Sequence, residues 1–166
     1  MSEIRKQDYY IGAVINILLS KNHDSKPSLM ECEEAPFAKT YKMITDTSNE
    51  FNLYIKYTSA CVKGTENVWS ISFTETDKDR IDACFQSGQK TFVILCCGNE
   101  PRKNGEIVVL THDEYSSMAH KTGIRVIVPG KGAKKYLIVD KQARKTFSVD
   151  RNRIETKITD IMSSLK

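Results

Sequence analysis

Lys56 raises the clearest chemical question in this sequence. It lies in the stretch LYIKYTSACVKGTENVWSISFT (residues 53–74), a pattern typical of two β-strands around a turn. One interpretation is that Lys56 forms half of a metal-dependent nuclease site, which also needs carboxylates because Mg²⁺ prefers their oxygens. The other is that Lys56 lies on a solvated sheet face. The two interpretations differ in whether acidic side chains share its face.

The nearest acidic candidates, Asp46 and Glu50, precede Lys56 on the neighbouring segment. Residues 40–46 and 51–59 are expected to form a β-hairpin. A two-residue turn places Asp46 and Lys56 on opposite faces, because side chains alternate along a strand, whereas a three-residue turn brings them to the same face. Further acidic side chains flank this hairpin: Glu31, Glu33 and Glu34. The sequence leaves both registers open and favours an exposed Lys56.

Other reactive residue types form no recognisable site. The histidines are far apart, and the sequence contains no Cys/His zinc spacing, P-loop or GxGxxG motif. Among the five cysteines, the adjacent Cys96 and Cys97 are typical of buried apolar residues in a reducing compartment. We therefore expect no cofactor, with Mg²⁺ needed only if the chain is a nuclease.

The charge is distributed unevenly. Residues 1–100 carry 11 Lys/Arg and 14 Asp/Glu, whereas residues 101–166 carry 14 and 7, which gives net charges of −3 and +7. A basic region of this kind favours an anionic partner such as nucleic acid. The candidate phosphate-binding residues are Arg125, Lys131, Lys134, Lys135, Lys141, Arg144 and Lys145. Tyr136 and Phe147 lie among them and are candidates for stacking on bases.

A second candidate in this region is the stretch PGKGAKK (residues 129–135), which has two glycines and three lysines. Such a hairpin tip can hold a phosphate through backbone amides and charge. A flexible turn is the alternative interpretation.

Hydrophobic periodicity predicts the elements that would position these residues. Helices are expected at residues 4–20, from Thr76 to Gly88, around residues 115–119 and over the closing segment 154–165. Strands are expected at residues 40–46, 51–59, 68–73, 91–97, 106–110, 124–128, 135–140 and 145–149. Thr76 with Asp79, and Thr111 with Glu114, have the spacing of capping boxes. The apolar run 91–97 predicts a central strand buried on both faces.

The chain of 166 residues, 40% of them hydrophobic, is long enough to bury one core. We predict a single α/β domain (mixed α+β) with a central mixed sheet flanked by helices, in the order α-β-β-β-α-β-β-α-β-β-α. A nuclease-like core over about residues 4–98 would precede a basic hairpin and a C-terminal helix over about 99–166. The sequence shows neither a signal peptide nor a membrane span, so we expect a cytoplasmic protein without a membrane partner.

The predicted order of a helix, a three-strand meander, a helix and a buried strand resembles the restriction-endonuclease-like core. The signature of that family is Pro-Asp, followed in the next strand by an acid two residues before a lysine. The resemblance implies that the acids hold Mg²⁺ and that the lysine orients or activates a water. Lys56 occupies the lysine position, but Tyr54 replaces the acid and Asp46 lacks a preceding proline. Any catalytic set would be Asp46, Glu50 and Lys56, with Asp46 and Glu50 as the metal ligands.

We therefore expect a nucleic-acid-associated protein with a nuclease-like core and a degenerate or absent catalytic site. One alternative is a protein-binding module, such as an inhibitor or assembly component, whose basic half docks on an acidic partner. A second alternative is an active Mg²⁺-dependent phosphodiesterase.

Overall fold

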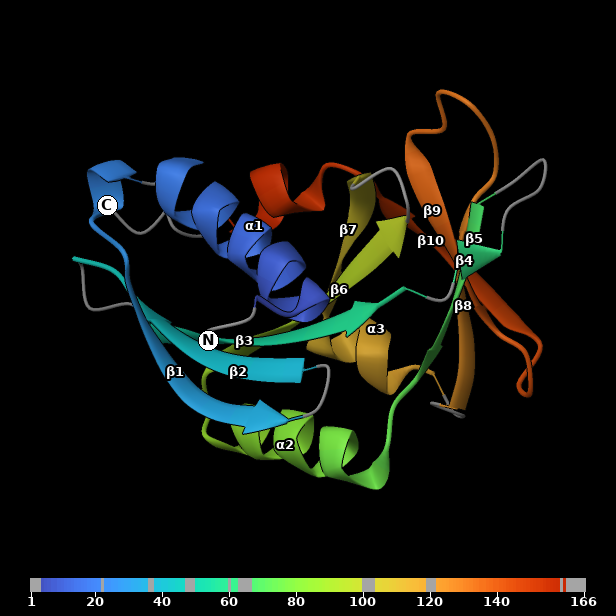
Figure 1. Ribbon diagram of the computed structural model, residues 1–166. Helices are drawn as coiled ribbons and strands as arrows, with labels where there is room; N and C mark the ends of the chain where they lie inside the picture. Colours follow the sequence, from blue (N-terminus) through green and yellow to red (C-terminus); the bar gives the residue numbers. More distant parts are fainter. Residues whose placement is uncertain are drawn as a thin grey trace.

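The strands form two five-stranded sheets, here called sheet A and sheet B, in a computed structural model of the chain (Figure 1). The structure describes residues 4–21, 23–35, 38–46, 50–59, 61–62, 67–99, 104–118, 122–158 and 160. In spatial order, sheet A consists of β1 (Ser28–Ala35), β2 (Ala38–Ile44), β3 (Glu50–Thr58), β6 (Lys90–Asn99) and β7 (Asn104–Thr111). Sheet B consists of β10 (Lys145–Asp150), β9 (Lys135–Asp140), β8 (Thr122–Val128), β5 (Asn67–Ser72) and β4 (Cys61–Val62).

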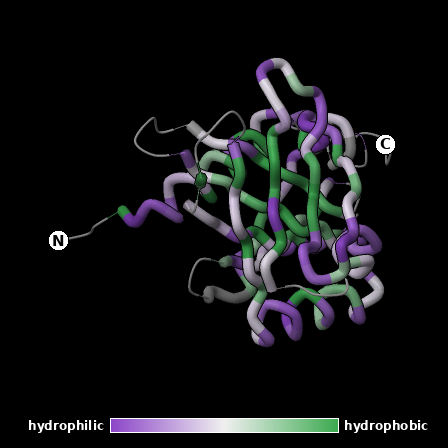
Figure 2. The backbone as a smooth tube through the Cα atoms, turned by 90° about the vertical axis from the view of Figure 1, so that its right-hand side faces the viewer, coloured by the Kyte–Doolittle hydropathy of each residue, from purple (hydrophilic) through white to green (hydrophobic). Residues whose placement is uncertain are grey.

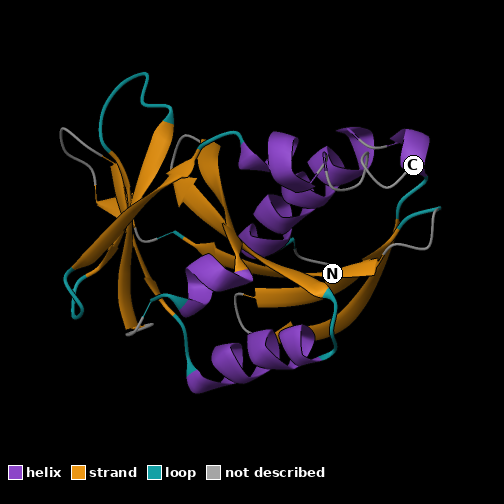
Figure 3. Ribbon diagram, turned by 180° about the vertical axis from the view of Figure 1, so that it is seen from behind, coloured by secondary structure: helices purple, strands orange, loops and turns teal. Residues whose placement is uncertain are grey.

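Helices flank sheet A, as expected for the mixed α+β class (Figure 3). They are α1 (Lys6–Lys21), α2 (Glu75–Gln86) and α3 (His112–Ser116), with a short 3-10 helix, η1 (His23–Ser25), and a π-helical turn, η2 (Ile154–Ile158). In sheet A only β3 and β6 are parallel, because α2 lies between them in the chain and carries it back across the sheet. The described helices are all too short or too polar to cross a membrane.

Sheet A separates two hydrophobic cores. On one face, Leu53 and Ile94 pack with Val14 of α1. On the other face, Val93 packs with Ile81 of α2 and with the inner side chains of sheet B, which include its buried tryptophan. Both faces of sheet A are therefore covered, and any polar side chain in its central strands needs a partner inside the protein.

The strand β6 confirms the prediction made from its apolar run. It lies between β3 and β7, and residues 91–99 are all buried. Cys96 and Cys97 are unpaired. Burial raises the pKa of the Cys96 thiol to about 12, so this thiol is poorly suited to nucleophilic chemistry.

The structure differs from the predicted elements in three places. The edge strand β1 was not among the predicted strands, and its exposed Glu31 suits a solvated sheet edge. The strand predicted at 68–73 belongs to sheet B, so the meander of sheet A consists of β1, β2 and β3. The closing helix begins as the π-helical turn η2, and residues 161–165 lie outside the described part of the chain.

The cap of α2 also differs from the prediction. The sequence TETDKD contains two overlapping capping-box spacings, and the helix uses Thr74 with Asp77 rather than Thr76 with Asp79. The predicted box of Thr111 with Glu114 is present at α3. The choice at α2 matters for the site, because Asp77 is buried beneath sheet A.

Candidate functional site

Lys56 is buried rather than exposed, which corrects the interpretation favoured from the sequence. Its side chain lies on the face of β3 that packs against α2, and only 9% of its surface is accessible. The ammonium donates to Oδ2 of Asp77 at 2.8 Å and lies 5.8 Å from the centre of the Phe73 ring. The sequence did not reveal this partner, because Asp77 lies 21 residues further along the chain on another element.

Asp77 collects hydrogen bonds from three sources. Besides Lys56, the Tyr54 hydroxyl donates to Oδ1, and the Thr74 backbone N–H donates to Oδ2 at 2.7 Å. Burial favours the neutral acid, but these hydrogen bonds outweigh burial and hold the pKa of Asp77 below its ordinary value. Burial and the Asp77 carboxylate together raise the pKa of the Tyr54 hydroxyl well above its usual range. The Tyr54–Lys56–Asp77 cluster is thus a carboxylate with its charge matched by a lysine.

The predicted catalytic residues do not come together. In the β2–β3 pairing, Ile44 lies opposite Glu50 and Ala38 lies opposite Lys56. The connection therefore spans residues 45–49, and both registers considered from the sequence are wrong. Asp46 lies in the turn and Glu50 at the first residue of β3, so about 20 Å of strand separates Glu50 from Lys56.

Glu50 is engaged at that distant end of the hairpin. Its carboxylate forms an ion pair with Lys42 at 2.6 Å and accepts a hydrogen bond from Gln89. Among the described residues, no three His, Cys, Asp or Glu side chains are arranged to hold a metal ion. A magnesium site built from Asp46 and Glu50 would therefore lie far from Lys56.

The predicted phosphate-binding residues lie mainly at the two ends of sheet B. Lys131, Lys134 and Lys135 are at the β8–β9 end, and Lys141, Arg144 and Lys145 are at the β9–β10 end. The six residues of β9 separate these ends by about 17–20 Å. Arg125 is half-buried on β8 between them. Figure 2 shows the strands of sheet B as largely hydrophobic between hydrophilic turns.

Most of these cations are available to a partner. Within the described ranges, no carboxylate forms an ion pair with Lys131, Lys134, Lys141 or Arg144. Lys135 lies 3.8 Å from Asp150 on the exposed surface, and such a pair contributes little stability. The Lys145 ammonium donates to the Ser117 carbonyl at 3.2 Å, so it also closes the carboxyl end of α3.

The aromatic residues proposed to stack on bases are not available on this surface. Tyr136 is 1% exposed, and its hydroxyl donates to Glu106 at 2.7 Å. Phe147 is half-buried and packs on the same core as Tyr136. Both side chains point inward because they alternate with the outward positions of β9 and β10.

The PGKGAKK loop is also not built as a phosphate cradle. Arg151, at the end of β10, donates to the Ala133 carbonyl at 2.7 Å and pairs with Glu106. The hollow of about 390 Å³ beneath the loop is lined by Glu106, Arg151 and Lys131, and the Arg151 guanidinium is already occupied by the Glu106 carboxylate. The Ala133 N–H, a candidate donor, already binds the Gly130 carbonyl at 3.2 Å. The loop is a turn fixed to sheet A.

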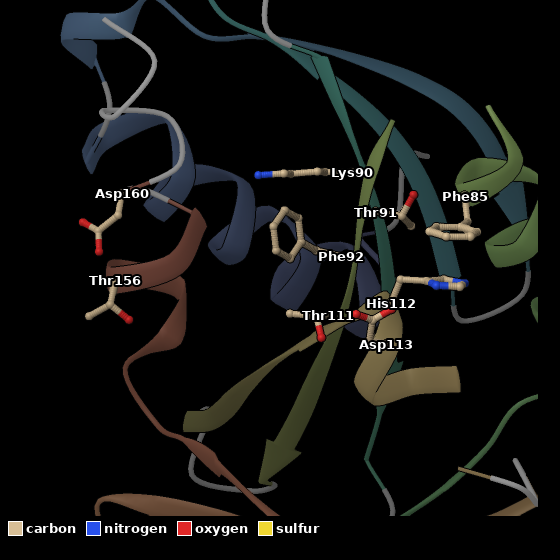
Figure 4. A pocket seen from close by; sticks show the side chains of 9 residues that line it. All are labelled: Phe85, Lys90, Thr91, Phe92, Thr111, His112, Asp113, Thr156 and Asp160. Atoms are coloured by element: carbon tan, nitrogen blue, oxygen red, sulfur yellow. The ribbon is translucent and has the colours of Figure 1, made fainter. Parts of the chain in front are cut away.

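A cleft of about 490 Å³ lies where β6 begins and β7 ends (Figure 4). On one side Phe85 of α2 and His112 of α3 stack with ring centres 3.6 Å apart and planes within 2°. Thr156 and Asp160 lie on the opposite side, Lys90 and Phe92 lie between the two sides, and Asp113 lies beside His112. Phe85 is 47% exposed on α2. No sequence pattern signalled this cleft, because its lining residues come from separate elements.

The His112 ring does not form a hydrolase triad with its neighbours. Ser116 Oγ lies 3.3 Å from one ring nitrogen and 3.4 Å from the other, so it is aligned with neither. The Asp82 carboxylate lies 3.9 Å from Nε2, which is also the ring nitrogen nearer to Ser116. In a catalytic triad the carboxylate and the serine contact opposite ring nitrogens. His120, eight residues after His112 in the sequence, lies outside the described residues.

No protein-family model matches the chain, and no curated protein or solved structure shows significant similarity to it.

Proposed function

We propose that this protein binds nucleic acid through sheet B and that its nuclease-like core works as a scaffold without a metal site. The observation that carries the binding proposal is the set of unpaired cations at both ends of sheet B. Lys131 and Lys134 at one end, and Lys141 and Arg144 at the other, are all exposed. Duplex DNA carries about one negative charge per 1.7 Å, so cations about 17–20 Å apart face many phosphates.

The arrangement of sheet A supports the scaffold part of the proposal. Within sheet A, α1, the β1–β2–β3 meander, α2 and a strand parallel to β3 resemble the order of the restriction-endonuclease-like core, with β1 in place of the predicted strand 68–73 and with β4 and β5 inserted before α2. Lys56 lies on the last strand of that meander. The position two residues earlier is Tyr54, the residue opposite is Ala38, and neither carries a carboxylate. The lysine is instead neutralised by Asp77, so no anionic metal site surrounds it.

This arrangement argues against the Mg²⁺-dependent phosphodiesterase. A catalytic lysine must face a bound metal and the scissile phosphate, whereas Lys56 faces a carboxylate inside the protein. We expect no metal-dependent cleavage of DNA or RNA above background in magnesium or manganese. Cleavage that disappears in both Lys56→Ala and Asp46→Ala would contradict this expectation.

Binding in rising salt tests the proposal directly. The test variant Lys134→Ala with Lys141→Ala removes one cation from each end of sheet B. The control, Lys21→Ala with Lys26→Ala, removes two exposed lysines near the end of α1. We expect the test variant to weaken binding on any sequence and to flatten the slope of log K against log salt by about 1.8, since each phosphate contact contributes about 0.9. The control should retain the parent slope.

A chain that binds neither duplex nor single strand at low salt would overturn the proposal. It would favour a second function, a protein-binding module, which one specific observation supports. Four apolar residues lie opposite one another across the outer face of sheet B: Val62, Val68, Ile127 and Leu137. Val62 is 65% exposed and the other three are half-buried, whereas the inward residues of the same strands are buried.

This row crosses the strands, and the basic turns at the two ends of sheet B flank it, which suits an apolar protein surface bordered by carboxylates. Val62→Ser with Ile127→Ser separates the two functions. The change should leave nucleic-acid affinity unaltered if the cations carry binding. It should abolish a protein complex built on the row.

A further inference from the structure

The cleft between α2, α3 and the start of β6 has mixed charge. Lys90 contributes one ammonium, whereas Asp113 and Asp160 contribute two carboxylates (Figure 4). The Thr91 and Thr111 side chains add hydroxyls that can donate or accept. The carboxylates oppose an anion, and the ammonium opposes a cation. The lining therefore suits a neutral group that presents both donors and acceptors along its edge.

The aromatic side of the cleft favours a ligand with a planar ring. His112 covers one face of Phe85, and Phe85 is still 47% exposed, so a second planar ring can extend the stack. The buried ring of Phe92 adds apolar surface to the lining. The cleft volume of about 490 Å³ falls within the range of small-molecule sites.

The cleft also lies near one basic end of sheet B. Lys145 contacts the carbonyl of Ser117, at the carboxyl end of α3, while His112 in the cleft begins that helix. The five residues of α3 span only about 7.5 Å. A nucleic-acid strand whose phosphates contact the turn that carries Lys141 and Arg144 therefore passes within a few nucleotides of the cleft.

We propose that this cleft binds an unpaired nucleobase of a strand held by the β9–β10 turn. The inference rests on the proposed nucleic-acid function and adds the contact that a phosphate surface lacks. The neutral base enters the aromatic, mixed-charge cleft, and the phosphates remain outside on the lysines. Bases with an exocyclic amino group, adenine and cytosine, are preferred over thymine because Asp113 accepts from that group.

The test compares oligonucleotides that share one backbone. Fluorescence anisotropy would measure the Kd of labelled dA12, dC12, dT12 and an abasic 12-mer. We expect dA12 and dC12 to bind more tightly than dT12, and dT12 more tightly than the abasic strand. Phe85→Ala should weaken dA12 binding about fivefold or more and leave the abasic strand unchanged, because stacking on an aromatic ring contributes about 1 kcal/mol or more per base.

Two further variants keep the test independent of folding defects. Tyr9→Ala removes another exposed aromatic, 55% accessible on α1, and should change none of the four affinities. Asp113→Asn alters an exposed residue and should reduce the preference for dA12 and dC12 over dT12 while the melting temperature is retained. Free adenosine should shift the His112 ring signals in NMR if the cleft recognises the base itself. Shifts with dA12 alone would mean that the strand must deliver it.

The outcomes distinguish this inference from the function on which it rests. Equal affinity for dA12 and the abasic strand, unchanged in Phe85→Ala, would overturn the base site and leave the phosphate surface intact. Failure of every oligonucleotide to bind would overturn both. Shifts of the His112 signals by argininamide but not by adenosine or dA12 would also overturn the inference and assign the cleft to a cationic side chain of a protein partner.

Discussion

The two capping boxes of this chain use the same motif for different purposes. In each, a threonine caps a helix and the acid three residues later binds back to the threonine N–H. Each acid also accepts from a cation on a distant element: Asp77 from Lys56 on β3, and Glu114 from Arg153 after β10. The Asp77 side chain is 4% exposed, whereas that of Glu114 is 24% exposed.

The difference shows how burial changes the role of a surface motif. Asp77 joins α2 to the central strands of sheet A, and both charges lie in the core. Glu114 joins α3 to the segment that follows sheet B, and Arg153 also donates to the Val109 carbonyl at 3.3 Å. The first box therefore stabilises the centre of the fold. The second fixes its last segment, close to solvent.

Asp77→Ala should have the largest effect on stability. The change leaves the Lys56 ammonium buried without its partner and removes the acceptor of the Thr74 N–H in the capping box, so we expect a loss of about 3–5 kcal/mol in the free energy of unfolding. Urea denaturation at neutral pH would measure it. Lys56→Met should cost less, about 1–3 kcal/mol, because Asp77 keeps the Tyr54 and Thr74 hydrogen bonds. Equal losses in Asp77→Ala and Lys56→Met would show that the hydrogen bonds from Tyr54 and Thr74 to Asp77 add nothing beyond the ion pair.

Glu114→Ala should have a smaller effect, because the Glu114 carboxylate is partly exposed and Arg153 keeps its hydrogen bond to the Val109 carbonyl. We expect a loss of about 1–3 kcal/mol, measured in the same way. Arg153→Met is the matched change on the cationic side. If Glu114→Ala destabilises the protein as much as Asp77→Ala, burial does not explain the contrast between the two boxes.

Removal of the threonine hydroxyl should reduce the free energy of unfolding by a similar amount in the two capping boxes. Thr74→Ala and Thr111→Ala each remove one side-chain acceptor for a helix N–H, with an expected cost of about 1 kcal/mol each. Thr76→Ala, at the unused capping position, is the control and should cost less than either. Thermal unfolding of the three variants measures the order, and a larger cost at Thr76 would contradict the assigned cap.

The dependence of stability on acidic pH should show the smallest difference between the two capping boxes. The pKa values of both Asp77 and Glu114 are lowered, because hydrogen bonds from Lys56 and Arg153 outweigh the effect of burial. The unfolded pKa values are near 3.8 for Asp77 and 4.5 for Glu114. A carboxyl whose pKa is lowered by folding stabilises the protein at pH values above its unfolded pKa. This stabilisation is lost as the pH falls through the pKa of the folded state. Glu114→Gln should therefore flatten stability against pH below about 4.5. A profile identical to the parent would remove Glu114 from this account.

Much of the fold could be predicted because its signals are local. Apolar runs placed β6 and four of the strands of sheet B, namely β5, β8, β9 and β10. The mistakes arose where a distant contact decided the outcome. Lys56 was interpreted as exposed because nothing nearby neutralises it, and the used capping box could not be distinguished from its overlapping neighbour without Asp77's contact to β3.

The candidate site was less predictable for the same reason. The pairing of β2 with β3 depends on a five-residue connection that no turn motif in TDTSN specifies, so Asp46 and Glu50 could not be placed relative to Lys56. The cleft combines residues from α2, β6 and α3, and only the tertiary fold brings them together. The basic residues were predictable as a group, but not their division between two ends of a sheet.

The adjacent thiols of β6 can be used to measure how often each of the two hydrophobic cores opens. Cys96 packs in the core on the α1 side of sheet A, and Cys97 packs in the core on the sheet B side. An alkylating reagent reaches either thiol only when its core opens. With Cys32, Cys61 and Cys84 replaced by serine, the labelling rates of Cys96→Ala and Cys97→Ala variants therefore measure the two openings separately. Equal rates mean that the two layers unfold as one cooperative unit. Faster labelling of Cys97 means that sheet B detaches first, while α1 stays packed on the central strands.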